Sequence, residues 1–251
     1  MKIIATDFDG TLNHGGIDDA KKSAISLWRQ KGNLFGVISG RGKNSLSDVI
    51  CDKGFEYDFL VANNGALIMD SEMKIIKEFR CDGVIARPFI KDLFSWGCPF
   101  GNIDSYSSFM VVNEKRPLRE GEMRLENIPG IEYFNQINTM LSTDEEAAVV
   151  VEKIKQKYSS VLNPLQNGNC IDITPKGVDK AQGIYALLEV FGGKSEDVIT
   201  VGDNINDEAM IREFTSYAMA NGVQYIKDIA NYTTTGITEL IHRELKMTSV
   251  D

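Results

Sequence analysis

The 251-residue sequence has little cysteine and almost no histidine. Its four cysteines are Cys51, Cys81, Cys98 and Cys170. They are widely scattered and lack the paired spacing of a zinc site or a disulfide framework, so we expect them to stay reduced in the cytoplasm. His14 and His242 are too few to indicate a histidine-based mechanism.

Long apolar runs are also missing, so we expect no membrane-spanning segment. Asp7 interrupts the N-terminal apolar stretch before a signal peptide could form. Positive charge is in deficit, because 27 Lys and Arg residues stand against 36 Asp and Glu residues, a formal net charge of -9. This balance argues against nucleic acid as a partner. It still allows a small phosphorylated substrate, because a few local donors and a metal ion can reverse the potential of one pocket.

Short apolar runs alternate with helical patterns along much of the chain. The runs at 2–6, 34–38, 59–62 and 198–201 predict buried strands. Apolar residues at helical spacing predict helices at 18–31, 43–51, 180–191 and 236–246. This alternation predicts an α/β fold with a Rossmann-like parallel-sheet core.

The rhythm changes between residues 81 and 167, where we expect a helix at 81–95, strands at 109–112 and 131–136, and a helix opened by a capping box at Thr143. We interpret this stretch as an inserted α+β cap domain. The predicted organisation is therefore a core formed by residues 1–80 and 168–251, with the cap at 81–167.

Four polar clusters follow predicted strands or begin a predicted helix. They are Asp7-Phe8-Asp9-Gly10-Thr11, Ser39-Gly40-Arg41, Lys180, and Gly202-Asp203-Asn204-Ile205-Asn206-Asp207. Ligands of open parallel sheets bind beyond the carboxyl ends of the strands, so we expect these clusters to converge. Four carboxylates in one place would repel unless a cation lay among them, and Mg²⁺ prefers oxygen ligands.

This arrangement predicts phosphoryl chemistry. Asp7 is the expected nucleophile, and Asp9 is placed to protonate the leaving alkoxide and later to accept a proton from water. The Ser39 hydroxyl, nearby backbone amides and Lys180 would hold the phosphoryl oxygens, and Gly40 would provide both the turn and a close approach to phosphate.

The four clusters, in this order, resemble those of the haloacid dehalogenase (HAD) superfamily of aspartate-nucleophile phosphatases. Asn63-Asn64-Gly65-Ala66 is similar to the Cof-type sugar-phosphatase branch, which carries a larger α/β (class IIB) cap at the position of the insertion. The resemblance implies Mg²⁺ bound by the carboxylates of Asp7 and Asp203 and by the Asp9 carbonyl. It also implies that Asp207 supports these ligands without binding the ion itself, and that Asn206 lies near the phosphate or a metal-bound water.

We therefore expect a Mg²⁺-dependent phosphatase that hydrolyses a small phosphorylated metabolite, such as a sugar phosphate, through a phospho-aspartyl intermediate on Asp7. Closure of the cap would exclude water and select the leaving group. A monomer or weak homodimer is expected. Two alternatives remain open, namely a phosphomutase, which returns the phosphoryl group to a sugar, and a non-catalytic sensor of a phosphorylated metabolite.

Overall fold

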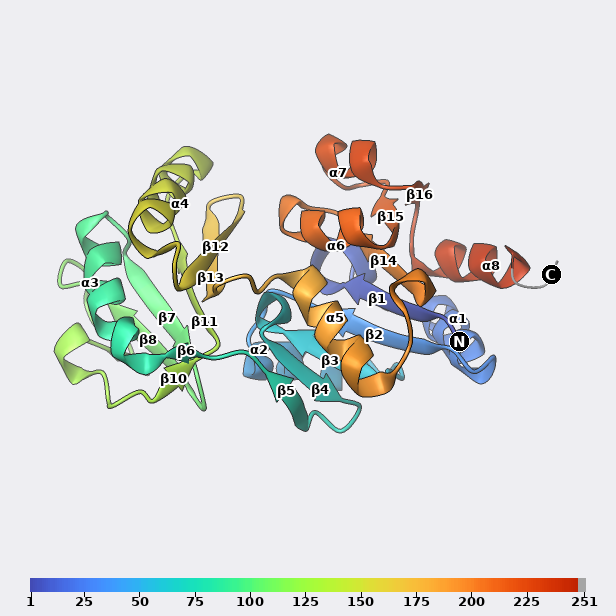
Figure 1. Cartoon of the computed structure of the whole chain (residues 1–251), viewed down its shortest axis with the longest axis horizontal. Coiled ribbons are helices and arrows are strands. Elements are labelled where there is room, and N and C mark those ends of the chain that lie inside the picture. Colours follow the sequence, from blue (N-terminus) through green and yellow to red (C-terminus); the bar gives the residue numbers. More distant parts are fainter. Residues whose placement is uncertain (248–251) are drawn as a thin grey trace. The chain divides into compact units, whose positions relative to one another are not determined.

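The computed structural model describes residues 1–247 and divides the chain into two compact units (Figure 1). The first unit contains Met1–Lys77 and the chain from Lys180 onward, and the second is Glu78–Asp179. The second unit ends later than the expected boundary at 167, because the strands that follow α4 pair within its own sheet.

The first unit is built on an eight-stranded sheet in the order β16-β15-β14-β1-β2-β3-β4-β5. The strands are β1 (Ile3–Asp7), β2 (Leu34–Ile38), β3 (Phe59–Ala62), β4 (Leu67–Asp70), β5 (Ile75–Glu78), β14 (Val198–Gly202), β15 (Thr215–Met219) and β16 (Tyr232–Thr234). The pairs from β16 to β3 are parallel, and β4 is antiparallel to β3. The central strands are buried on both faces, which explains their nearly continuous apolar sequences.

Helices cover both faces of this sheet. They are α1 (Asp19–Gln30), α2 (Lys43–Cys51), α5 (Lys180–Phe191), α6 (Glu208–Glu213), α7 (Gln224–Ile229) and α8 (Ile237–Met247). Side chains of α1, α2 and α8 share one hydrophobic cluster with alternate residues of the strands. On the opposite face, α5 packs so closely that a Cβ added at Gly183 would lie 3.0 Å from Val61 of β3. The predicted α/β core is thus a doubly wound sheet.

Sequence signals define the individual helices. Asp18 precedes α1, and its side chain accepts a hydrogen bond of 2.9 Å from the Lys21 amide, which caps the helix. Ala24, Ile25 and Trp28 recur at helical spacing and are buried, so α1 is held by its apolar face.

The second unit contains a six-stranded sheet in the order β12-β13-β11-β7-β8-β9 and a two-stranded pair of β10 and β6. Its strands are β6 (Cys81–Asp82), β7 (Phe100–Asp104), β8 (Ser108–Val112), β9 (Glu122–Met123), β10 (Tyr133–Phe134), β11 (Gln136–Met140), β12 (Leu162–Asn167) and β13 (Cys170–Pro175). Its helices α3 (Ala86–Ser95) and α4 (Asp144–Tyr158) pack on the sheet through one hydrophobic cluster. The expected α+β insertion is therefore present.

Two expectations for this unit were wrong in detail. The helix expected at 81–95 begins only at Ala86. The residues before it form β6, which pairs with β10. At Gly83 the two segments lie so close that a Cβ would be 1.9 Å from the carbonyl oxygen of Ile131. The single strand expected at 131–136 is instead divided between β10 and β11.

Within residues 1–247, none of the helices combines the length and apolar character needed to cross a bilayer.

Candidate active site

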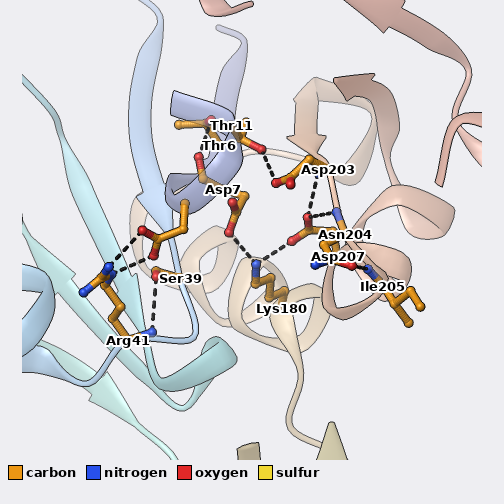
Figure 2. Close-up of polar contacts among 11 residues, drawn as sticks. Thr6, Asp7, Thr11, Ser39, Arg41, Lys180, Asp203, Asn204, Ile205 and Asp207 are labelled. Atoms are coloured by element: carbon orange, nitrogen blue, oxygen red, sulfur yellow. Dashed lines mark hydrogen bonds and ion pairs between the residues drawn. The ribbon is translucent and has the colours of Figure 1, made fainter. Parts of the chain in front are cut away.

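Three carboxylates lie together at the carboxyl edge of the first unit's sheet. Asp7 is the last residue of β1, Asp203 follows the adjacent parallel strand β14, and Asp207 closes the short helical turn Ile205–Asp207. One carboxylate oxygen from each lies within 4.8 Å of the others. The expected convergence of the first and fourth clusters is therefore seen in the structure (Figure 2).

Lys180 lies between two of these carboxylates. Its side chain is fully buried, and its Nζ lies 2.7 Å from Asp7 Oδ1 and also pairs with Asp207 Oδ1 (Figure 2). Burial alone would lower the pKa of Lys180, but the negative charges of Asp207 and Asp7 outweigh it and raise the pKa above its ordinary value. The residue is therefore a fixed ammonium ion, and it is the first residue of α5.

Asp207 also shapes the loop that carries Asp203. Its Oδ2 accepts hydrogen bonds from the backbone amides of Asp203 (2.9 Å) and Asn204 (3.1 Å). The loop can approach this carboxylate only because position 202 is glycine, since a Cβ there would lie 2.4 Å from Asp207 Oδ2. Both Asp207 oxygens are thus engaged by protein donors, one by Lys180 and the other by the backbone.

Asp203 faces the loop that follows β1. Thr11 Oγ1 donates a hydrogen bond of 2.8 Å to Asp203 Oδ1. Gly10 has a φ of 82°, and a Cβ at this position would lie 2.4 Å from Asp203 Oδ2, so both the backbone conformation and the space require glycine. Thr11 belongs to the first motif, but its sequence position alone does not indicate this hydrogen bond to Asp203.

Asp9 is held by Arg41, for which the sequence alone predicts no role. Arg41 Nε donates to Asp9 Oδ2 (2.6 Å), and a second guanidinium nitrogen donates to Oδ1 (2.9 Å). This is a bidentate, charge-assisted pair between the first and second motifs. The carboxylate of Asp9 therefore points to Arg41 in this structure, while Asp7 points to Lys180.

The Ser39 loop lies between β2 and α2. Ser39 is almost fully buried, and its Oγ accepts a hydrogen bond of 3.2 Å from the Arg41 amide. Because this contact uses an oxygen lone pair, the hydroxyl hydrogen is still available to a phosphoryl oxygen. Gly40, in the same loop, and Asn206, in the turn before Asp207, are both half-buried.

A strained turn supports this loop. Asn63 and Asn64 both have positive φ, 53° and 49°, and both are buried. The Asn63 amide donates to the Arg41 carbonyl and the Asn64 amide to the Ser39 carbonyl, each at 2.9 Å. Left-handed residues other than glycine are uncommon and costly, so this turn is maintained by its contacts. These hydrogen bonds hold the backbone that carries Ser39 and Arg41.

The charge of the cluster fits a divalent cation. In their ionised forms, Asp7, Asp203 and Asp207 contribute three negative charges and Lys180 one positive charge, which leaves a net charge of two negative units. Burial raises the pKa of Asp7 well above its ordinary value; Lys180 opposes this effect and Asp207 adds to it. A cation supplied to the cluster would favour the ionised carboxylates, and their oxygen atoms suit Mg²⁺.

Comparison with known proteins first identifies the class. The sequence profile of haloacid dehalogenase-like hydrolases matches residues 4–239. A curated relative is the 5-amino-6-(5-phospho-D-ribitylamino)uracil phosphatase YcsE of Bacillus subtilis, 27% identical over 239 residues that cover 93% of this chain and 90% of the relative. The phosphatase of the same description from Escherichia coli, YbjI, is 22% identical over 269 residues, covering 98% of this chain and 97% of the relative.

Solved structures of similar fold include two that match nearly the whole chain. The HAD subclass IIB sugar phosphatase BT4131 shares the fold with a TM-score of 0.79 at 22% identity, over 100% of both chains. SMU.1108c from Streptococcus mutans has a TM-score of 0.81 at 23% identity, covering 98% of this chain and 99% of the other. The chain belongs to the haloacid dehalogenase-like hydrolases and is an enzyme of the phosphatase type. The resemblance to the HAD superfamily inferred from the motifs is confirmed.

Proposed function

We propose that this enzyme hydrolyses a small phosphate monoester through a phospho-aspartyl intermediate on Asp7. The observation that carries the proposal is the position of Asp7 at the end of β1, with Lys180 Nζ at 2.7 Å and two further carboxylates beside it. Lys180 binds one carboxylate oxygen of Asp7, so the other oxygen can act as the nucleophile. The positive charge of Lys180 offsets the negative charge of the incoming phosphoryl group.

In the first step, the Asp7 carboxylate forms an oxygen–phosphorus bond while the bond from phosphorus to the leaving alcohol breaks. Asp9 gives its proton to the departing oxygen. In the second step, Asp9 takes a proton from water and the water oxygen attacks phosphorus. The bond between the Asp7 oxygen and phosphorus breaks, which regenerates the Asp7 carboxylate and frees inorganic phosphate. Asp9 must leave Arg41 for these transfers, because the guanidinium occupies both of its oxygens in the present structure.

The phosphoryl oxygens would be held by Ser39, by the backbone around Gly40, by Lys180 and by Asn206. The Asp7 and Asp203 carboxylates and the Asp9 carbonyl would hold Mg²⁺. When bound, the ion would supply positive charge that screens the nucleophile from the phosphate. Asp207, whose oxygens are already used by Lys180 and the backbone, would keep the ammonium and the Asp203 loop in place.

The substrate we propose is a phosphorylated polyol or sugar. Support comes from relatives whose names specify a phosphoribityl-aminouracil substrate and from the sugar-phosphatase neighbour. A panel of such monoesters, assayed for inorganic phosphate with Mg²⁺ and with EDTA, tests both the substrate class and the metal. Transfer of phosphate to a second sugar without release of inorganic phosphate would indicate a phosphomutase instead.

The intermediate can be tested directly. Acid quenching during turnover followed by borohydride reduction converts an aspartyl phosphate into homoserine, and peptide mass spectrometry should locate that change at position 7. Asp7→Asn should lose both the homoserine and turnover, with an unchanged circular dichroism spectrum, because the two side chains are nearly the same size. Turnover by Asp7→Asn, or a homoserine at another position, would exclude the mechanism.

A further inference from the structure

The second unit contains a cavity that is separate from the carboxylate cluster. It has a volume of about 710 Å³ and is lined by α3, the end of β8 and the turn Leu125–Asn127. All of its lining residues belong to Glu78–Asp179. This volume lies within the range of pockets that hold small organic ligands.

The floor of the cavity is apolar. Phe94 and Leu125 are half-buried and Val112 is almost fully buried, and all three contribute to the lining. Pro88, in the first turn of α3, adds a rigid apolar wall. This lining suits a ligand with a planar or compact apolar body.

Around this floor, positive charge outnumbers negative charge. The charged lining residues are Arg87, Lys91, Lys115, Arg124, Glu114 and Glu126. Four cations against two carboxylates leave two positive charges, although the whole chain carries a formal net charge of -9. Among residues 1–247, no carboxylate forms an ion pair with any of these four cations.

Two of the cations are fixed by neutral acceptors. The two terminal guanidinium nitrogens of Arg87 donate to the carbonyls of Leu125 (2.8 Å) and Ile128 (2.7 Å). Arg124 donates to the carbonyls of Asn113 and Arg116, the latter at 2.8 Å. Carbonyl oxygens orient these groups without cancelling their charge, so the wall is preorganised and remains cationic.

We propose that this cavity is a second binding site, which takes a small organic anion with an apolar body. The body would lie on Phe94, Val112 and Leu125, and the acidic group would face Lys91 and Lys115. The proposal is independent of the phosphatase mechanism, because none of its residues belongs to the carboxylate cluster.

The fluorescent probe 8-anilinonaphthalene-1-sulfonate, an aromatic anion, tests the site in the full-length protein. Lys91→Gln combined with Lys115→Gln should weaken its binding about five- to tenfold, the expected effect of losing two exposed charge contacts. Lys155→Gln combined with Lys176→Gln removes the same total charge from exposed positions outside the cavity and should change the affinity less than about twofold.

Two further measurements separate this cavity from other apolar surfaces. Ser95→Trp, at an exposed lining position, adds an indole ring that should obstruct the cavity and remove one equivalent of bound probe. N-phenyl-1-naphthylamine, which lacks the sulfonate, should bind the wild type and the Lys91/Lys115 variant equally. The proposal is overturned if Ser95→Trp leaves the stoichiometry unchanged, or if both lysine pairs weaken the anionic probe by the same factor.

Discussion

Lys180→Met removes the ammonium that lies between Asp7 and Asp207 and replaces it with an uncharged side chain of similar length. Both carboxylates are buried, and Lys180 itself has no exposed surface. The net charge of the cluster would change from two to three negative units. We therefore expect the variant to be strongly destabilised without added metal, in addition to losing activity.

The magnitude follows from the loss of one partner in a buried ion pair, which costs about 3–5 kcal/mol because the remaining charge stays buried. For a chain of this length, each kcal/mol corresponds to a change in Tm of about 2–4 °C. The expected fall in Tm is therefore on the order of 10 °C. Protonation of Asp7 would limit the loss, since burial already raises its pKa.

A double-mutant cycle measures the electrostatic coupling between Lys180 and Asp207. Asp207→Asn removes one of the carboxylates that Lys180 neutralises, so Lys180→Met/Asp207→Asn should be more stable than Lys180→Met alone, by about 1–3 kcal/mol. Thermal unfolding followed by circular dichroism in EDTA at pH 7.5 measures all three variants. Lys155→Met, at an exposed position, is the control. A normal Tm for Lys180→Met, or a double variant less stable than Lys180→Met, would refute this reasoning.

Three other substitutions test separate parts of the structure. Asp9→Asn should slow turnover of alkyl phosphates by about 10²–10⁴-fold, because their leaving groups need a proton. It should slow the first step with p-nitrophenyl phosphate much less, and equal losses in stopped-flow assays would exclude Asp9 as the acid. Burial raises the pKa of the Asp104 carboxyl from 3.8 to about 6. Between these two pH values the folded state holds the proton more tightly than the unfolded state, so the wild type loses stability as the pH rises from about 4 to about 6. Asp104→Asn should match the wild type at pH 4 in urea unfolding and exceed it at pH 8 by about 2 kcal/mol; a gain that is independent of pH would contradict this assignment. Gly183→Ala places a Cβ 2.5 Å from the backbone of the turn at 63–65 and should lower the Tm by several degrees, whereas Gly236→Ala meets nothing within 4 Å and should not; equal Tm values would show that α5 can shift.

Local sequence was sufficient to predict the core elements that carry the site. An apolar run ended by a polar motif identified β1, β2 and β14, and Lys180 was placed correctly at the start of α5. The rule for the carboxyl edge of parallel strands then predicted that Asp7 and Asp203 would meet. These features depend on short segments and on one general property of α/β sheets.

Contacts between distant segments could not be predicted in the same way. The pair of Asp9 and Arg41 depends on two loops approaching each other, and Arg41 alone in a turn has no distinguishing pattern. The end of the insertion was also placed too early, because the pairing of β13 with β11 is not evident from the sequence of either strand. The catalytic roles given to the site residues stay predictions that the experiments above address.

The point at which the chain returns to the first unit has a practical consequence. Every residue of the carboxylate cluster, and Lys180 as well, lies outside Glu78–Asp179. The segment Glu78–Asp179 can therefore diverge, or be exchanged for that of a relative, without altering any group proposed to contact phosphorus. In such an exchange, all of the proposed hydrolytic residues would be inherited intact.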